Sequence, residues 1–198
     1  MKYINQLEYG HIPYITRTQM ETEEDRKKGE TTTVRGSGCG LCSAIMVLDR
    51  LFVNYDFTLE DAIQLSYDSG ANVGRGTMYA CFAPALAEKF GLEVEMNNDP
   101  ERLRYCLRTG GVAVLRTRGD YEGHIGIFSH GGHYVTLIGE ERDGRIAILD
   151  PSNKPGKYDE EGRECVEVKN EQILLCDMES IVKEFALGNP ALYLFWRK

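Results

Sequence analysis

The chain has 198 residues and a formal net charge of −8 at neutral pH, from 31 acidic and 23 basic side chains. Apolar residues make up 42% and charged residues 27% of it, a composition typical of a globular domain with a buried core, which excludes disordered, collagen-like and coiled-coil chains. The acidic balance argues against nucleic acid as a partner, and no apolar stretch reaches the length of a bilayer span, so we expect no membrane insertion.

The N-terminal part of the chain favours helices. We expect residues 1–38 to be irregular, apart from a short strand at residues 12–15 and a charged, solvated loop at residues 21–30. Beyond them, apolar residues recur at helical spacing, and threonine or aspartate caps precede three of the runs. The expected helices cover residues 39–52, 59–65, 78–90 and 100–108.

The C-terminal part favours strands, because from Gly110 onward short β-rich runs alternate with glycine and charged residues. The pair Asp143-Gly144 is typical of a tight hairpin turn between two of these runs. A last helix is expected over residues 178–187, preceded by a weak strand. The other expected strands cover residues 92–96, 112–115, 125–128, 133–138, 146–149 and 191–196.

Helices followed by antiparallel strands predict an α+β fold. We expect a single domain over residues 1–198. Its helical half is expected at about residues 39–109 and its sheet half at about residues 110–198.

Six cysteines are too few for a disulfide scaffold, and one of them has the position of a reactive thiol. Cys39 lies between two glycines at the start of an apolar helix, where the helix dipole favours the thiolate, the nucleophilic form. A buried structural cysteine is the alternative that position alone leaves open. We expect the others to face or fill the core: Cys42, Cys81, Cys106, Cys165 and Cys176.

His133 and Asp150 are the candidates for proton transfer. His133 is expected at the start of one strand and Asp150 at the end of the next, and these two ends lie side by side in an antiparallel hairpin. A cysteine, a histidine and an aspartate can supply a nucleophile, a general base and a group that orients the base. His124 and His130 remain rivals for the base, and an Asp-Pro turn remains the alternative for Asp150.

Cys39 and Cys42 also form a C-x-x-C pair, which is typical of zinc ligands or of a redox-active disulfide. A zinc site needs two further ligands, and the only other close pair of such residues is His130 and His133. A redox pair is expected in a thioredoxin-like βαβ setting, which this chain lacks. We therefore expect no metal and no cofactor.

Three short motifs resemble those of a known enzyme family: Gly38-Cys39-Gly40, Gly132-His133-Tyr134-Val135 and Leu149-Asp150-Pro151. Their order and separation resemble the double-glycine (bacteriocin-leader) peptidase-like branch of the papain-like cysteine peptidases. Residues 76–92 are similar to the middle helix of that family, and the resemblance covers about residues 12–155. It implies a papain-like fold in which Cys39 is the nucleophile, His133 the base and Asp150 the residue that orients the base.

The chain departs from the family pattern at two places. Leu41-Cys42 follows the Gly-Cys-Gly motif where the family usually has Pro-Thr or a similar pair. The glutamine that stabilises the oxyanion in the family is replaced, in two simple alignments, by Thr33 and by Arg17, so we take Gln19 as its substitute. An oxyanion donor is worth on the order of 3–4 kcal/mol of barrier, so the activity is expected to depend on such a group.

The resemblance implies a thiol hydrolase that cleaves an amide bond in a peptide or protein substrate. Two other functions stay open: a catalytically degenerate peptide-binding module, and an acyltransferase or deamidase that uses the same three residues. If Met1 is the native start, the chain is expected in the cytoplasm, and removal of a signal peptide would instead place it outside the cell. The sequence gives no indication of an oligomeric state.

Overall fold

The computed structural model describes residues 2–16, 33–74, 76–185 and 190–198. Its helices are the 3₁₀ helix η1 Gln6–Glu8 and the α-helices α3 Val34–Ser37, α4 Cys39–Leu51, α5 Leu59–Asp68, α6 Tyr79–Phe90, α7 Pro100–Arg108 and α8 Met178–Lys183. Its strands are β1 Leu92–Asn97, β2 Val112–Thr117, β3 His133–Glu140, β4 Ile146–Leu149, β5 Val166–Val168, β6 Leu174–Cys176 and β7 Leu192–Arg197.

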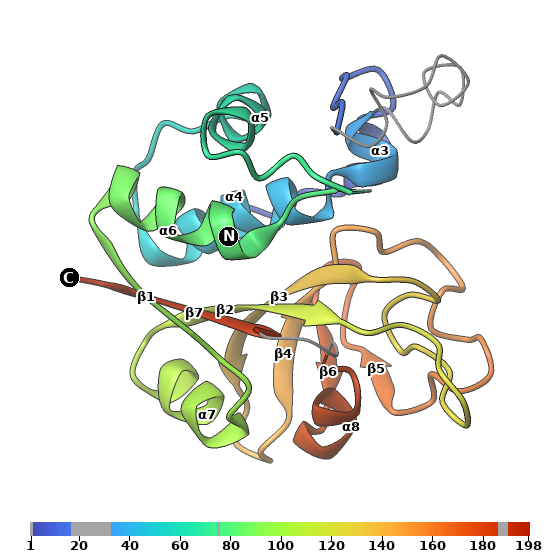
Figure 1. The fold of residues 1–198 in the computed structure, drawn as a ribbon. Coiled ribbons are helices and arrows are strands. Elements are labelled where there is room, and N and C mark those ends of the chain that lie inside the picture. The colour runs from blue at the N-terminus through green and yellow to red at the C-terminus, as the bar shows by residue number, and fades with distance from the viewer. Residues whose placement is uncertain (1, 17–32, 75, 186–189) are drawn as a thin grey trace.

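The molecule has three layers. A seven-stranded antiparallel sheet with the order β1-β7-β2-β3-β4-β6-β5 forms the middle layer. Helices α4, α5 and α6 lie on one side of this sheet, and α7 and α8 lie against its other face (Figure 1). The predicted α+β class is therefore confirmed. Among the described residues, none of the helices combines the length and apolar character that crossing a bilayer requires.

Two of the predicted helices begin at their predicted caps, whereas α6 begins after Met78, which makes no capping hydrogen bond with its side chain. Thr58 and Asp61 make a capping box at the start of α5, and Asp99 caps α7 with Pro100 as its first residue. Gly91 ends α6 in the left-handed conformation, at φ +63°, which suits a residue without a side chain. At most of the helix ends, these local signals therefore predict the boundary to within one residue.

Both faces of the sheet are buried, which explains the continuous apolar runs in its central strands. In β2, Val112 and Val114 belong to the core beneath α4 and α6, whereas Ala113 and Leu115 belong to a second core against α7 and α8. Side chains alternate along a strand, so odd and even residues of β2 face different layers.

The chain crosses to the sheet earlier than predicted. β1 pairs with the C-terminal strand β7 at the edge of the sheet, and α7 covers the face opposite to α4. The expected boundary near residue 110 is therefore misplaced, and the change from helical layer to sheet comes at Gly91 and Leu92. The sequence hides this crossing because β1 is followed by another helix.

Residues 125–128 were expected to be a strand and instead lie in a loop. The backbone N–H of Gly126 donates to Asp120, and that of Ile127 donates to Glu184 at 2.9 Å, so side-chain carboxylates replace the partners of a strand ladder. At residues 12–15 only an isolated bridge forms, between Pro13 and Thr33. The charged run at residues 21–30 lies outside the described residues.

Candidate active site

Cys39 is the first residue of α4 and is partly exposed. Its two neighbouring glycines are required by close packing: a Cβ on Gly38 would lie 2.5 Å from the carbonyl oxygen of Val34, and one on Gly40 would lie 2.9 Å from the Cβ of Thr77. The short helix α3, which the sequence did not reveal, approaches the start of α4 through this first contact. The glycines thus allow the thiol to lie at a helix N-terminus that is packed on both sides.

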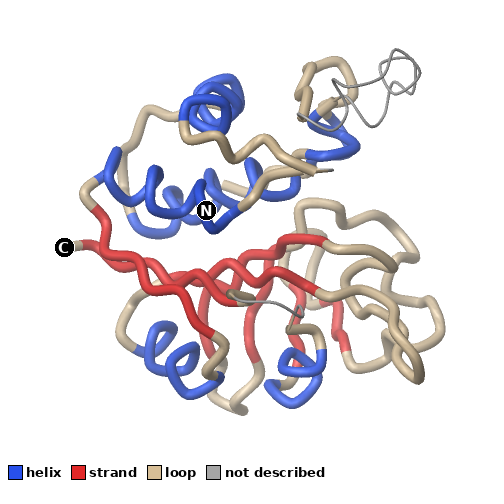
Figure 2. Tube along the Cα trace, in the orientation of Figure 1, coloured by secondary structure: helices blue, strands red, loops and turns tan. Residues whose placement is uncertain are grey.

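The predicted proximity of His133 and Asp150 is confirmed. His133 begins β3 and Asp150 follows the last residue of β4, where the register pairs Thr136 with Leu149. A hydrogen bond of 2.7 Å joins His133 Nε2 to Asp150 Oδ1, and the two side chains are 6% and 0% exposed. The loops that follow β2 and β4 lie at this same end of the sheet (Figure 2). The antiparallel hairpin therefore positions the pair as its topology requires.

Asp150 is surrounded by donors that the sequence did not reveal. The ammonium group of Lys157 and the hydroxyl of Tyr158, at 2.6 Å, both donate to Oδ2. The backbone N–H of Ser152 donates to Oδ1 at 2.8 Å. Lys157 and Tyr158 directly precede a run of acidic residues at 159–161, yet both are buried. Asp150 is thereby held as a carboxylate in one orientation.

The charges of the site are set by this network. Burial by itself would raise the pKa of Asp150, but the charge and hydrogen bond of His133, and then Lys157, hold it well below its usual range. Burial lowers the pKa of His133, but Asp150 outweighs it, with Cys39 adding to the effect, and raises that pKa to about 9. The site therefore favours a charged imidazolium at neutral pH.

The thiol of Cys39 responds to the same histidine. Burial raises its pKa, but the hydrogen bond and charge of His133, together with the backbone N–H groups of Tyr134 and Gly40, bring it below its ordinary value. Because Nε2 of His133 is bonded to Asp150, Nδ1 is the ring nitrogen left for the sulfur. A thiolate beside an imidazolium is a nucleophile with a proton donor in reach.

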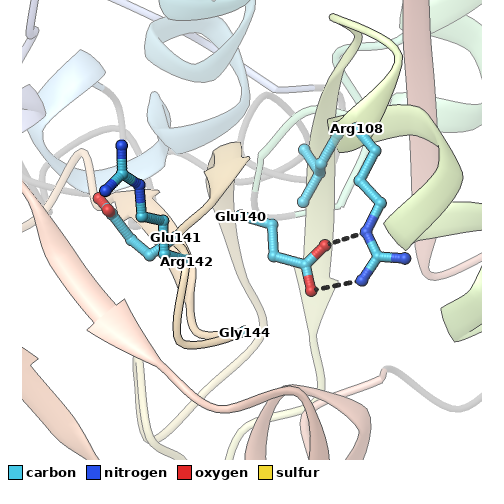
Figure 3. Close-up of a pocket in the computed structure, with 6 residues that line it drawn as sticks. Arg108, Glu140, Glu141, Arg142 and Gly144 are labelled. Carbon is cyan, nitrogen blue, oxygen red and sulfur yellow. Dashed lines mark hydrogen bonds and ion pairs between the residues drawn. The ribbon is translucent and has the colours of Figure 1, made fainter.

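Cys39 and His133 line the same cleft, whose volume is about 630 Å³. Its walls come from the loop before α6, with Thr77 and Met78, and from the strands β2, β3 and β7. A hollow at the far end of β3 carries different chemistry, since Glu140 there is held by an ion pair with Arg108 at 2.6 Å (Figure 3). The groups suited to nucleophilic chemistry, Cys39 and His133, therefore both line the first cleft.

The rival histidines lie elsewhere. His124 Nε2 bonds Glu184 at 2.6 Å, and His130 is exposed, with Asp120 and Glu160 as its partners. Gln19, the expected oxyanion donor, lies outside the described residues. The structure therefore joins His133, and neither rival, to Cys39 and Asp150.

The other thiols are less uniform than expected. Cys42, Cys106 and Cys176 are buried as predicted, and the pKa of Cys42 is raised by burial. Cys81 is exposed on α6, so its assignment to the core is wrong, because α6 turns that position to solvent. Cys165 is only half-buried. With the Cys42 sulfur in the core, the C-x-x-C pair does not present two thiols to one site.

The comparisons with known proteins support the fold. No family model matches the chain, and neither does any curated protein. Among solved structures, the crystal structure of a putative C39-like peptidase from Bacillus anthracis matches with a TM-score of 0.53 at 12% sequence identity, over 81% of this chain and 89% of that one. The resemblance predicted from the sequence motifs is thus confirmed at the level of the fold.

Proposed function

We propose that this protein is a cysteine peptidase with a papain-like arrangement, in which Cys39, His133 and Asp150 cleave a peptide amide bond. The observation that carries the proposal is the position of His133, whose ring is fixed by a buried carboxylate on one side and lowers the pKa of a helix N-terminal thiol on the other. The fold shared with a putative C39-like peptidase supports the same conclusion.

In the first half of the reaction, the thiolate of Cys39 attacks the carbonyl carbon of the substrate amide, and a C–S bond forms. The imidazolium of His133 then gives its Nδ1 proton to the amide nitrogen, the C–N bond breaks, and the amine leaves. Asp150 keeps the ring in position and stabilises its charge. The product of this half is a thioester between Cys39 and the acyl part of the substrate.

In the second half, the neutral imidazole takes a proton from a water molecule, whose oxygen attacks the thioester carbonyl. The C–S bond breaks, the acid leaves, and Cys39 and His133 return to thiolate and imidazolium. The backbone N–H of Cys39 at the start of α4 would stabilise the oxyanion of both intermediates, together with a side chain near Gln19.

Alkylation and cleavage test the proposal together. Iodoacetamide is expected to label Cys39 roughly tenfold faster than Cys81, although Cys81 is the more exposed thiol. A diverse peptide library incubated with the wild-type protein should yield cleaved products by mass spectrometry, and the Cys39→Ala variant should yield none. Cys81→Ala is the matched control, since this thiol lies outside the cleft, and it should cleave as the wild type does.

The outcomes separate this function from its alternatives. Equal labelling of the two thiols without any cleavage would contradict the proposal. Peptide binding that survives in Cys39→Ala, without turnover by the wild type, would instead indicate a binding module. Release of ammonia from glutamine or asparagine side chains would indicate a deamidase.

A further inference from the structure

Arg116 lies in the cleft beside the nucleophile and is not needed for the proposed chemistry. It is on β2, directly across from Tyr134 on β3, and it is half-buried. Val112 and Val114 face the core beneath the helices, so Arg116, two residues further, is on the same side of the sheet. Cys39 and His133 line this cleft as well. The guanidinium group therefore shares the substrate's space.

No acidic group among the described residues forms an ion pair with Arg116. Its neighbours in the cleft include Tyr134 and Tyr193, whose pKa values are raised by burial despite the opposing charge of Arg116, so both hydroxyls stay neutral. Among the described residues that line the cleft there is no aspartate or glutamate. The side chain has no ion pair or hydrogen bond within the described part of the chain.

This situation differs from that of the arginines that form ion pairs. Arg102 pairs with Glu95, and Arg145 pairs with Asp143 and with Glu167. In a chain with a net charge of −8, acidic partners are abundant, so an unpaired, half-buried guanidinium in a cleft stands out. Half-burial without a partner costs solvation free energy, which a bound anion would restore.

We propose that Arg116 binds a carboxylate of the substrate, so that the substrates are peptides with an acidic group close to the scissile amide. This inference rests on the proposed function. The carboxylate can come from an aspartate or glutamate side chain or from the C-terminus of the peptide, and a guanidinium binds either one through two parallel hydrogen bonds. The local cation also counters the repulsion that an acidic protein exerts on an acidic substrate.

A pair of alkylating reagents tests the charge of the cleft without any turnover. Iodoacetate and iodoacetamide both transfer a two-carbon group to Cys39 with loss of iodide, but only the first is an anion. The rate of iodoacetate divided by the rate of iodoacetamide at Cys39 should fall about fivefold in Arg116→Gln and further in Arg116→Glu. In Arg116→Lys, which keeps the positive charge, this ratio should remain near the wild-type value. Because the reactivity of the thiol affects both reagents, the ratio isolates the charge.

Arg142 provides the matched control, because it is exposed in the turn between β3 and β4 (Figure 3). This turn follows Glu140, the last residue of β3, whereas His133 is the first residue of that strand. The rate ratio should be unchanged in Arg142→Gln. In the wild type the ratio should also fall as salt is added, which needs no variant to fold. An unchanged ratio in Arg116→Gln and Arg116→Glu would overturn the proposal.

Peptides then identify the source of the carboxylate. A series in which one glutamate replaces glutamine at successive positions, each made with a free or an amidated C-terminus, is measured for binding to Cys39→Ala and Cys39→Ala/Arg116→Gln. A preference of about fivefold for one acidic position or for the free C-terminus, lost with Arg116, identifies the group. Equal binding of all peptides would overturn the inference.

The two proposals fail in different ways. If no peptide is cleaved by the wild type, while the rate ratio and the binding preference depend on Arg116, the peptidase fails and the anion site stands. If peptides are cleaved but neither readout depends on Arg116, the peptidase stands and the anion site fails.

Discussion

Two histidines of this protein each form a short hydrogen bond with a fully buried carboxylate. His133 bonds Asp150 at 2.7 Å, and His124 bonds Glu184 at 2.6 Å. Distance and burial of the carboxylate do not distinguish the two pairs. Their surroundings do, because the ring of His133 acts on the thiol of Cys39 in a cleft, whereas the ring of His124 stacks on Tyr121 at 4.5 Å.

The two carboxylates also serve different ends. Both oxygens of Asp150 accept hydrogen bonds, from a histidine, a lysine, a tyrosine, a serine hydroxyl and a backbone N–H. Glu184 Oε1 bonds His124 and the backbone N–H of Ile127, whereas its buried Oε2 has no hydrogen-bond partner among the described residues. The second pair fastens a loop to the end of α8. A histidine–carboxylate pair therefore indicates a catalytic site only when a third reactive group, such as a thiol, faces the imidazole ring.

The largest expected difference between the pairs comes from neutralising each carboxylate. Asp150→Asn leaves Lys157 buried without a counter-charge and should lower the free energy of unfolding by about 3–5 kcal/mol. It should also lower kcat/KM by about 10²–10⁴, because the ring loses the group that orients it. Glu184→Gln should cost about 1–3 kcal/mol and leave kcat/KM nearly unchanged. Urea unfolding and kinetics on a cleaved peptide measure both quantities.

A double variant separates stability from catalysis at Asp150. Adding Lys157→Met to Asp150→Asn removes the uncompensated ammonium and should restore part of the stability without restoring activity. Recovery of activity in the double variant would show that Asp150 acts only on the fold.

Replacing each histidine is expected to have the next largest effect. His133→Gln should lower kcat/KM by about a thousandfold, because the site loses its proton donor and base, and the pKa of Cys39 should rise. His124→Gln should leave kcat/KM within about threefold and cost about 1–2 kcal/mol of stability. The pH dependence of iodoacetamide labelling reports the thiol pKa in both variants. A loss of activity in His124→Gln as deep as that in His133→Gln would contradict the comparison.

Much of this arrangement follows from local sequence. The start of α4 at Cys39 follows from a helical apolar pattern after Gly38, and the hairpin that brings His133 to Asp150 follows from strand alternation and one turn, all of which are readable in the chain. The roles of Lys157 and Tyr158 are not readable, because they depend on how an irregular loop folds back onto the sheet. The spacing of apolar residues in the sequence does not indicate that a loop folds back in this way.

The mistaken strand has a related cause. Residues 125–128 have the apolar pattern of a strand, but whether a backbone pairs in a sheet depends on what else can accept its N–H groups. Here Asp120 is near in sequence, while Glu184 is brought from the other end of the chain by α8. The same long-range contact that makes the second histidine pair therefore removes the predicted strand.

The pH dependence of the free energy of unfolding should give a smaller difference between the two histidine–carboxylate pairs. The folded pKa of His133 is raised to about 9 from 6.5, so its contribution to stability is fully present below pH 6.5 and is lost as the pH rises through about 9. The shift corresponds to about 3 kcal/mol. Unfolding measured from pH 6 to 10 should show this loss in the wild type and in His124→Gln, and not in His133→Gln.

Activity should follow the same titration. Loss of the imidazolium as the pH rises through about 9 removes the proton that the leaving amine needs, so kcat/KM should decline there. A profile that stays flat through pH 10 would contradict the assignment of His133 as the proton donor.

The smallest expected effect concerns the thiols beside the second pair. The side-chain hydrogen bond with Cys176 lowers the pKa of Cys165 to about 7, while the same hydrogen bond and burial raise the pKa of Cys176, with a smaller effect from the charge of Glu184. Cys165 is half-buried, so iodoacetamide should label it, with a midpoint near pH 7 that His133→Gln does not move. Cys165→Ser should leave kcat/KM within about twofold, because neither thiol of this pair faces the cleft.

The reason lies in what lowers each thiol pKa. For Cys39 the opposing charge is on a histidine that can also deliver a proton to a leaving group, whereas for Cys165 the partner is another thiol, which stabilises a thiolate but supplies no such proton relay. A loss of turnover in Cys165→Ser, or a labelling midpoint that shifts with His133, would show that the two regions act together. If both stay unaffected, a lowered thiol pKa and a buried histidine–carboxylate pair can lie near each other in one fold without forming a catalytic site.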